Sequence, residues 1–193
     1  MKNKTIRIGI DVDETICFIA QDILDILNLK NNTNHSLEEI TEYRIEKCLN
    51  VSDEDIKFAV KTAIYNDPEF IEDAVTVINW LSASANIYFL TARPSEDSDI
   101  THKLLFDLGL IQPYYVFLNC DKVDIINKLE IDYMIEDRAK YAEDIIDNTS
   151  CIVLLLDKPW NRHAKSHDRL TRVYNWGDII LFFVNRLNAV TYG

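Results

Sequence analysis

The sequence predicts an α/β fold, in which helices cover both faces of a parallel β-sheet. Apolar runs of strand length recur along the chain, and each ends in a polar or acidic residue. Helical patterns separate these runs. The chain has 193 residues, of which 48% are hydrophobic, so it can form one domain with a substantial core and an insertion.

Five apolar runs have the composition of buried strands. They are TIRIGID at 5–11, NIYFLT at 86–91, YYVFLN at 114–119, DYMIED at 132–137 and CIVLLLD at 151–157. Helical patterns lie at 74–85, 100–110, 122–130, 140–147 and 176–188. Ligands of parallel sheets bind beyond the carboxyl ends of the strands, where the strand order reverses. Asp11, Thr91, Glu136 and Asp137 all fall at such ends.

The region from about 17 to 72 differs, because helical periodicity dominates it and no run in it reads as a strand. Ser36 and Glu39 fit a capping box that would start one of its helices. A helical insertion directly after the first strand would hang over the open end of the sheet as a lid. We therefore expect a core domain of residues 1–16 and 73–193 and a small helical cap of residues 17–72. The cap helices are expected at 18–28, 36–49 and 52–65.

The charge balance argues against binding to a polyanion. Twenty Lys and Arg residues against 32 Asp and Glu residues give a net charge of −12, which opposes general attraction to a nucleic acid polymer or an anionic membrane. The chain starts without a long apolar segment, and the run at 179–184 is too short to span a bilayer. We expect a soluble, cytoplasmic protein. A small anionic substrate would need a metal ion or a few well-placed cations.

Two aspartates, Asp11 and Asp13, follow the first predicted strand. Carboxylates this close repel each other unless a proton, a donor or a metal relieves the charge. A calcium EF-hand loop is excluded, because Ile16 and Asp22 stand where Gly and Glu would be needed. Acidic residues after strands also serve as helix caps and turn formers, so the pair alone leaves both interpretations open.

The other strand ends favour a catalytic interpretation. A carboxylate, a hydroxyl, a lysine and an acidic pair follow one another along the chain, each at or just after a strand end. In this order the chain resembles a phosphatase of the haloacid dehalogenase (HAD) superfamily. DVDET at 11–15 is similar to the first motif, Thr91 to the second, Lys122 to the third, and Glu136 with Asp137 to the fourth. The resemblance implies a Rossmann-like sheet with a helical cap inserted after the first strand.

Further segments resemble the small bacterial branch of the 5′(3′)-deoxyribonucleotidase family, and the resemblance covers essentially the whole chain. The segments are TARP at 91–94, IEDR at 135–138, DKPWNR at 157–162 and RVYNWGDI at 172–179. Glu14 departs from the pattern, since many relatives have Gly there, and Glu136 stands where mammalian-type enzymes have Asp. Neither departure removes a group that the chemistry needs.

The resemblance implies a Mg²⁺-dependent phosphomonoester hydrolase that dephosphorylates nucleoside monophosphates. Asp11 would attack phosphorus and form an aspartyl phosphate, and Asp13 would move protons to and from the reacting oxygens. Mg²⁺ prefers oxygen ligands, which Asp11, the backbone carbonyl of Asp13 and Asp137 would supply. Glu136 would be a further ligand or would orient the ligands.

Three residues are implied to bind the phosphate: Thr91, Lys122 and Arg93. Helix capping is the alternative for Thr91. Lys128 is the alternative for the lysine, although its place within a helix favours a solvated face. Arg93 could instead form a surface ion pair, and for Arg138 a surface pair is favoured.

Other functions remain compatible with these residues. The substrate could be another small phosphorylated metabolite, because fold and motifs determine the reaction more firmly than the leaving group. A phosphotransferase would use the same residues, and a binding protein without activity would keep the fold alone. Trp160 either lies near the site or fills a packing gap. The sequence gives no indication of an oligomeric state.

Overall fold

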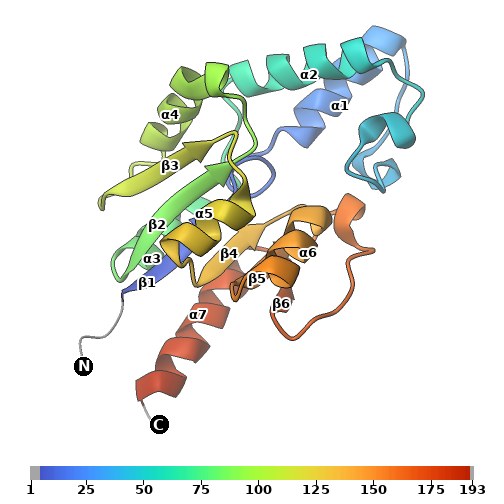
Figure 1. Cartoon of the computed structure of the whole chain (residues 1–193). Coiled ribbons are helices and arrows are strands. Elements are labelled where there is room, and N and C mark those ends of the chain that lie inside the picture. The colour runs from blue at the N-terminus through green and yellow to red at the C-terminus, as the bar shows by residue number, and fades with distance from the viewer. Residues whose placement is uncertain (1–4, 192–193) are drawn as a thin grey trace.

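The sheet is parallel throughout and has the strand order β3-β2-β1-β4-β5-β6 (Figure 1). The computed structural model describes residues 5–191 and the side chains of residues 5–186. Within them the strands are β1 (Ile6–Ile10), β2 (Ala85–Thr91), β3 (Tyr114–Leu118), β4 (Tyr133–Glu136), β5 (Ile152–Leu156) and β6 (Leu170–Val173). The predicted α/β class and the five predicted strands are confirmed. The sixth strand, β6, was not predicted, because Thr171 and Arg172 interrupt its apolar pattern.

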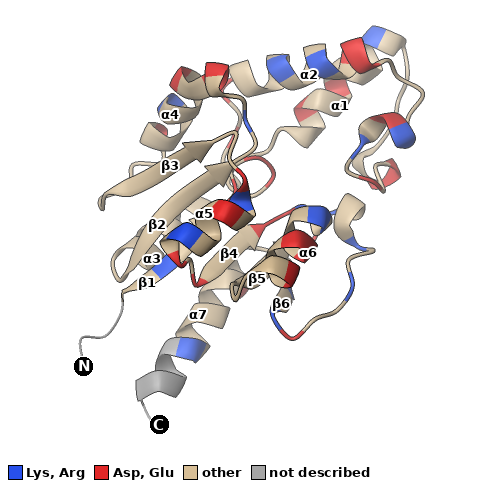
Figure 2. Cartoon of the chain, viewed as in Figure 1, with Lys and Arg blue, Asp and Glu red and all other residues tan. Residues whose placement is uncertain are grey.

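Helices cover both faces of the sheet. Beyond the insertion they are α3 (Ala74–Ser82), α4 (Ser98–Asp107), α5 (Lys122–Leu129), α6 (Ala139–Asn148) and α7 (Trp176–Thr191). Buried residues of α3, α4 and α7 pack with Ile8 and Ile10 of β1 in one core cluster. Buried residues of α5 and α6 pack with Leu90 and Met134 in a second cluster on the other face. Charged residues therefore concentrate on the helices and at the strand ends, while the strands are nearly free of them (Figure 2).

The insertion leaves and re-enters the sheet domain at neighbouring points. Phe18 donates its backbone N–H to the Glu69 carbonyl at 2.9 Å, and Ile71 donates to the Ile16 carbonyl at 2.9 Å. Between these points the helices α1 (Ala20–Asn31) and α2 (Asp53–Tyr65) lie beyond the carboxyl ends of the strands (Figure 1). The division into a core and a cap stays a prediction with which this placement agrees.

The middle helix predicted for the insertion, at 36–49, is wrong. The segment forms two single 3₁₀ turns, Leu37–Glu39 and Ile45–Lys47. The Ser36–Glu39 capping box is present, but it starts only the first turn. Ile40 and Leu49 pack in a small cluster that includes Trp160, so a folded loop buries the apolar residues whose spacing suggested a helix. Tertiary packing here overrides a weak local preference.

The last helix ties the sheet to the loop that follows β1. Trp176 begins α7, is fully buried, and donates its indole N–H to the Thr15 carbonyl at 2.9 Å. Thr15 is also fully buried, so the tryptophan is the partner of a carbonyl that water does not reach. Among residues 5–191 no helix is both long and apolar enough to cross a membrane.

We expect Trp176→Phe to lower the free energy of unfolding by about 2–3 kcal/mol, because it leaves a small void and a buried carbonyl without a donor. Urea denaturation followed by circular dichroism measures the change. Trp80→Phe is the matched control, since Trp80 lies on α3 and is 38% exposed. Its replacement should change the free energy of unfolding little. Equal effects of the two substitutions would contradict the role assigned to Trp176.

Candidate active site

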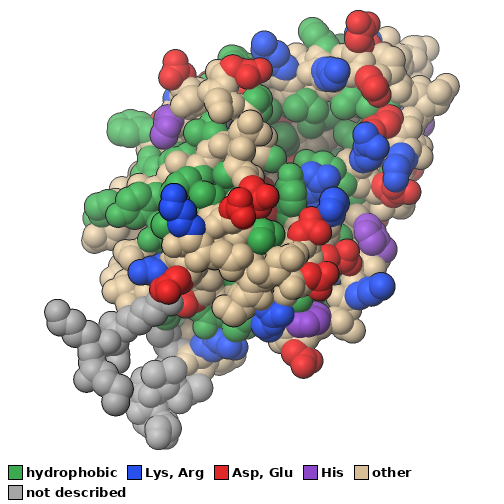
Figure 3. Space-filling view, viewed as in Figure 1, with side chains coloured by type: hydrophobic (Ala, Val, Ile, Leu, Met, Phe, Trp, Pro, Cys, Tyr) green, Lys and Arg blue, Asp and Glu red, His purple; other side chains and the backbone are tan. Residues whose placement is uncertain are grey.

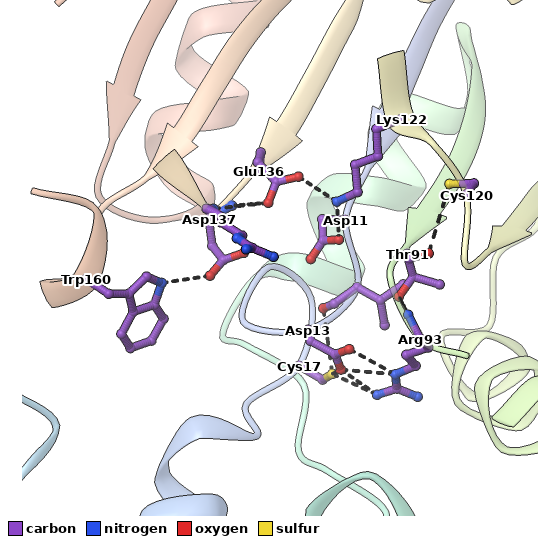
Figure 4. A network of polar contacts seen from close by, with 12 residues as sticks. Asp11, Asp13, Cys17, Thr91, Arg93, Cys120, Lys122, Glu136, Asp137 and Trp160 are labelled. Atoms are coloured by element: carbon purple, nitrogen blue, oxygen red, sulfur yellow. Dashed lines mark hydrogen bonds and ion pairs between the residues drawn. The ribbon is translucent and has the colours of Figure 1, made fainter. Parts of the chain in front are cut away.

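The strand order brings the predicted site residues to one edge of the sheet (Figure 4). Asp11 directly follows β1, Thr91 ends the neighbouring strand β2, and Glu136 ends β4 on the other side of β1. Lys122 begins α5, shortly after β3. β1 lies between β2 and β4, so β2 and β3 extend the sheet to one side of β1, and β4 to β6 extend it to the other. The strand order therefore reverses beside Asp11, and parallel sheets bind ligands at such a point.

Lys122 bridges two carboxylates beneath this edge. Its Nζ lies 2.5 Å from Asp11 Oδ1 and 2.6 Å from Glu136 Oε2, and the side chain is buried. Burial alone would lower the pKa of Lys122, but the charges of Asp11 and Glu136 raise it above its ordinary value. The ammonium therefore stays protonated. Lys128, the alternative lysine, is exposed on the outer side of α5.

Three buried carboxylates cluster at this edge, and Lys122 contacts two of them. Asp11, Glu136 and Asp137 each offer one oxygen, and these oxygens lie within 4.8 Å of one another. Burial, together with the charges of Glu136 and Asp13, raises the pKa of Asp11 to about 8, although Lys122 opposes the shift. Burial, followed by the charges of Glu136 and Asp11, also raises the pKa of Asp137 well above its ordinary value. The surplus of negative charge and the oxygen-only ligands fit a divalent metal site.

Some carboxylate oxygens of the cluster accept hydrogen bonds from the protein, and others have no donor and could bind a metal ion. Glu136 Oε2 accepts from Lys122, and Glu136 Oε1 accepts the backbone N–H groups of Asp137 at 3.2 Å and Arg138 at 3.0 Å. Asp137 Oδ2 accepts the indole N–H of Trp160 at 2.9 Å. Within the described part of the chain, Asp11 Oδ2 and Asp137 Oδ1 have no hydrogen-bond donor.

Asp13 is held by Arg93 rather than left free. Arg93 Nε lies 3.1 Å from both carboxylate oxygens of Asp13, and Nη2 lies 2.6 Å from Oδ1. Arg93 is buried, whereas the Asp13 side chain is 25% exposed, so the arginine fixes a carboxylate that still reaches the solvent-accessible side of the site. The sequence predicts phosphate binding for Arg93; the structure places it on Asp13.

Thr91 does not cap the following helix. Its Oγ1 accepts the backbone N–H of Arg93 at 3.1 Å, while α4 begins at Ser98 with Asp97 before it. The hydroxyl is buried and keeps its own proton for a second hydrogen bond. The capping alternative is therefore not supported by the structure.

Arg138 forms no ion pair among the described residues. The prediction that its side chain forms a surface ion pair is therefore wrong. Its guanidinium lies 3.8 Å from the ring centre of Tyr43 and 4.5 Å from that of Tyr141. Its Nε is buried without a hydrogen-bond partner. The sequence did not indicate either contact, because Tyr43 is distant from Arg138 in the chain and neither tyrosine lies in a recognisable motif.

An apolar cleft of about 390 Å³ opens beside Asp13 and Arg93. Side chains of the insertion line most of it, among them Ile19, Ile23 and Leu24. In the space-filling view hydrophobic side chains line part of a hollow whose rim also carries charged side chains (Figure 3). Trp160 lines the cleft as well as donating to Asp137, so it lies at the site.

A family model described as "5′ nucleotidase, deoxy (Pyrimidine), cytosolic type C protein" matches residues 4–187. The chain belongs to this nucleotidase family. "Putative nucleotidase YqfW" of Bacillus subtilis is 28% identical over 186 residues, which are 93% of this chain and 94% of that protein. A nucleotidase of Clostridium acetobutylicum is 29% identical over 180 residues, 90% of this chain and 91% of that protein.

Solved structures of haloacid dehalogenase-like hydrolases share the fold of this nucleotidase family member. A haloacid dehalogenase-like hydrolase from Streptococcus pneumoniae has a TM-score of 0.65 at 14% identity, covering 93% of this chain and 99% of that one. The magnesium-bound "putative HAD-hydrolase YfnB" from Bacillus subtilis has a TM-score of 0.60 at 15% identity, with coverages of 93% and 99%. These structures confirm the predicted fold. The family model confirms the predicted nucleotidase family and enzyme class: the protein is a hydrolase of the phosphatase and nucleotidase type.

We expect the metal-free protein to become less stable as the pH rises from about 4 to about 8. The pKa of Asp11 in the folded state, about 8, exceeds the ordinary value of 3.8, so the folded state binds the proton more tightly than the unfolded state across this window. Thermal unfolding in EDTA should show a loss of at least ~1 kcal/mol, roughly one pKa unit, between the two ends.

Asp11→Asn should reduce the slope of this pH dependence, because the amide carries no titrating proton, while Asp137, whose pKa is also raised, keeps part of it. Asp168→Asn is the control, since Asp168 is exposed in the loop before β6. An unchanged slope in Asp11→Asn would show that Asp11 is not the titrating group.

Proposed function

We propose that the protein is a Mg²⁺-dependent phosphomonoester hydrolase that acts on nucleoside monophosphates. The observation that carries the proposal is the buried cluster of Asp11, Lys122, Glu136 and Asp137 at the strand ends. Membership of the nucleotidase family supports the substrate class, and the names of the relatives agree with it. We also propose residues 17–72 as the cap and residues 1–16 and 73–193 as the core.

The residues present fit a magnesium ion. Asp11 Oδ2 and Asp137 Oδ1 are the carboxylate oxygens without a donor, and the backbone carbonyl of Asp13 would be a third ligand. Both oxygens of Glu136 are engaged by donors, so Glu136 would hold Lys122 and the loop after β4 in place. When bound, Mg²⁺ would reduce the repulsion between the attacking carboxylate and the phosphate dianion.

In the proposed reaction Asp11 attacks phosphorus as the bond to the leaving oxygen breaks, which gives an aspartyl phosphate. Asp13 donates its proton to that leaving oxygen. Asp13 then takes a proton from the water that attacks the same phosphorus, and the Asp11 carboxylate is released. Arg93 would keep Asp13 oriented for both transfers. Lys122 and Thr91 would stabilise the phosphoryl oxygens by charge and by hydrogen bond.

The cleft supports a substrate with an apolar or aromatic group beyond its phosphate. Its volume of about 390 Å³ falls in the range of small-molecule sites, and its lining is mostly apolar. Asp13 and Arg93 lie on its border, so the leaving group would extend from the reacting phosphate into the cleft. A nucleoside has this combination of a flat ring and a short linker.

We expect phosphate release from a panel of nucleoside 5′- and 3′-monophosphates, and its loss when EDTA removes the metal. Asp11→Asn should lower kcat at least ~10³-fold, because the amide is a poor nucleophile for the first step. A malachite green assay measures the phosphate, and Asp168→Asn serves as the exposed control that keeps full activity.

Two results would count against the proposal. Turnover that survives both EDTA and Asp11→Asn would exclude the proposed chemistry. Activity that is no higher on nucleotides than on sugar phosphates or other phosphorylated metabolites would exclude the proposed substrate class. Phosphorylated products formed from added alcohols would indicate a phosphotransferase.

A further inference from the structure

Glu14 adopts a backbone conformation that a residue with a side chain usually avoids. It follows Asp13 directly, it is buried, and its φ of 59° lies in the left-handed region. Its backbone N–H donates to the Cys17 carbonyl at 2.9 Å, which closes the loop after β1. Glycine would fit this conformation without strain, so contacts of the Glu14 carboxylate must offset the strain.

One carboxylate oxygen of Glu14 holds the start of α1. Oε1 accepts the backbone N–H of Ile19 at 2.7 Å and that of Ala20 at 2.6 Å. Ile19 occupies the N-cap position of α1 and has no side-chain acceptor of its own. Glu14 therefore supplies from outside the helix both the missing acceptor and a negative charge at the positive end of the helix. Ile19 and Ala20 also line the cleft.

The other oxygen holds the loop that contains Trp160. Glu14 Oε2 lies 3.1 Å from Lys158 Nζ, and the two side chains are 10% and 15% exposed. Lys158 Nζ also lies 5.2 Å from the ring centre of Phe18 and 5.9 Å from that of Trp160. Lys158 precedes the 3₁₀ turn Pro159–Asn161, in which Trp160 lines the cleft and donates to Asp137.

We propose that Glu14 is a specificity-determining clamp for the substrate group that fills the cleft. Its carboxylate joins two walls of the cleft, one from the insertion at Ile19 and Ala20 and one from the sheet domain at Lys158 and Trp160. Without the clamp the two walls separate, and the part of the substrate beyond the phosphate loses its contacts. The groups that bind the phosphate lie at the strand ends and keep theirs. This inference rests on the proposed function.

Three variants divide the clamp into its parts. Lys158→Met removes the contact to the Trp160 loop and leaves the bonds to α1. Glu14→Gln removes the charge but keeps an acceptor for the N–H groups of Ile19 and Ala20. Glu14→Gly removes both contacts and fits the left-handed backbone. Because Glu14→Gln and Lys158→Met break the same ion pair, the double variant should behave like either single one.

The kinetic test compares the best nucleoside monophosphate of the panel with acetyl phosphate, which has no group to fill the cleft. We expect Glu14→Gly to raise KM for the nucleotide about tenfold, as for the loss of one charge-assisted hydrogen bond, with kcat within about threefold. Glu14→Gln and Lys158→Met should raise KM for the nucleotide less. None of the three variants should change KM for acetyl phosphate. A fall in kcat on both substrates, or an equal rise in KM on both, would overturn the proposal, because Glu14 would then act on Asp13 or on protein folding.

Hydrogen–deuterium exchange tests the clamp without any substrate. Glu14→Gly should speed exchange at residues 19–24 and 158–161 relative to the wild type, and leave β5 unchanged. Unchanged exchange at both segments would overturn the clamp even if the kinetics shifted. If the wild type hydrolyses none of the phosphates, the proposed function fails, and the exchange experiment alone decides whether Glu14 joins the two walls.

Discussion

The site depends on one buried arrangement, in which Lys122 is shared by Asp11 and Glu136 at the ends of two neighbouring strands. Burying three carboxylates with a single ammonium leaves a surplus of negative charge that is unfavourable in a low-dielectric interior. Nothing in the packing of the strands requires this arrangement, since leucines would fill the same volume. It is understandable if a cation and a phosphate complete the charge balance during function, which is what the proposed reaction supplies.

The fold makes this convergence possible. Parallel strands place all their carboxyl ends at one edge, and the order β3-β2-β1-β4 makes neighbours of segments that lie far apart in the sequence. The insertion after β1 then covers the edge with apolar side chains. In the proposed function, phosphate chemistry and recognition of the rest of the substrate therefore come from different parts of the chain. The contacts of Glu14, directly after the acidic pair, would join them.

Much of this could be read from the sequence. Apolar runs ending in polar residues predicted β1 to β5 and placed Asp11, Thr91 and Glu136 at strand ends, because strand periodicity is local information. The 3₁₀ turns at 37–47, the strand β6 and the stacking of Arg138 on Tyr43 were missed, because each depends on partners distant in the chain. The partner of Arg93 was missed for the same reason. Its residue type suggested that it binds phosphate, and only the structure shows that it pairs with Asp13.

We expect the cluster of Asp11 and Asp137 to bind one divalent cation. Titration with Mn²⁺, with free ion followed by electron paramagnetic resonance and Mg²⁺ added as competitor, measures this directly in the absence of substrate. We expect one Mn²⁺ ion bound per chain, which Mg²⁺ displaces. Asp137→Asn should abolish this binding, while Asp168→Asn should leave it intact. A stoichiometry of zero, or an Asp137→Asn protein that binds as the wild type does, would contradict it.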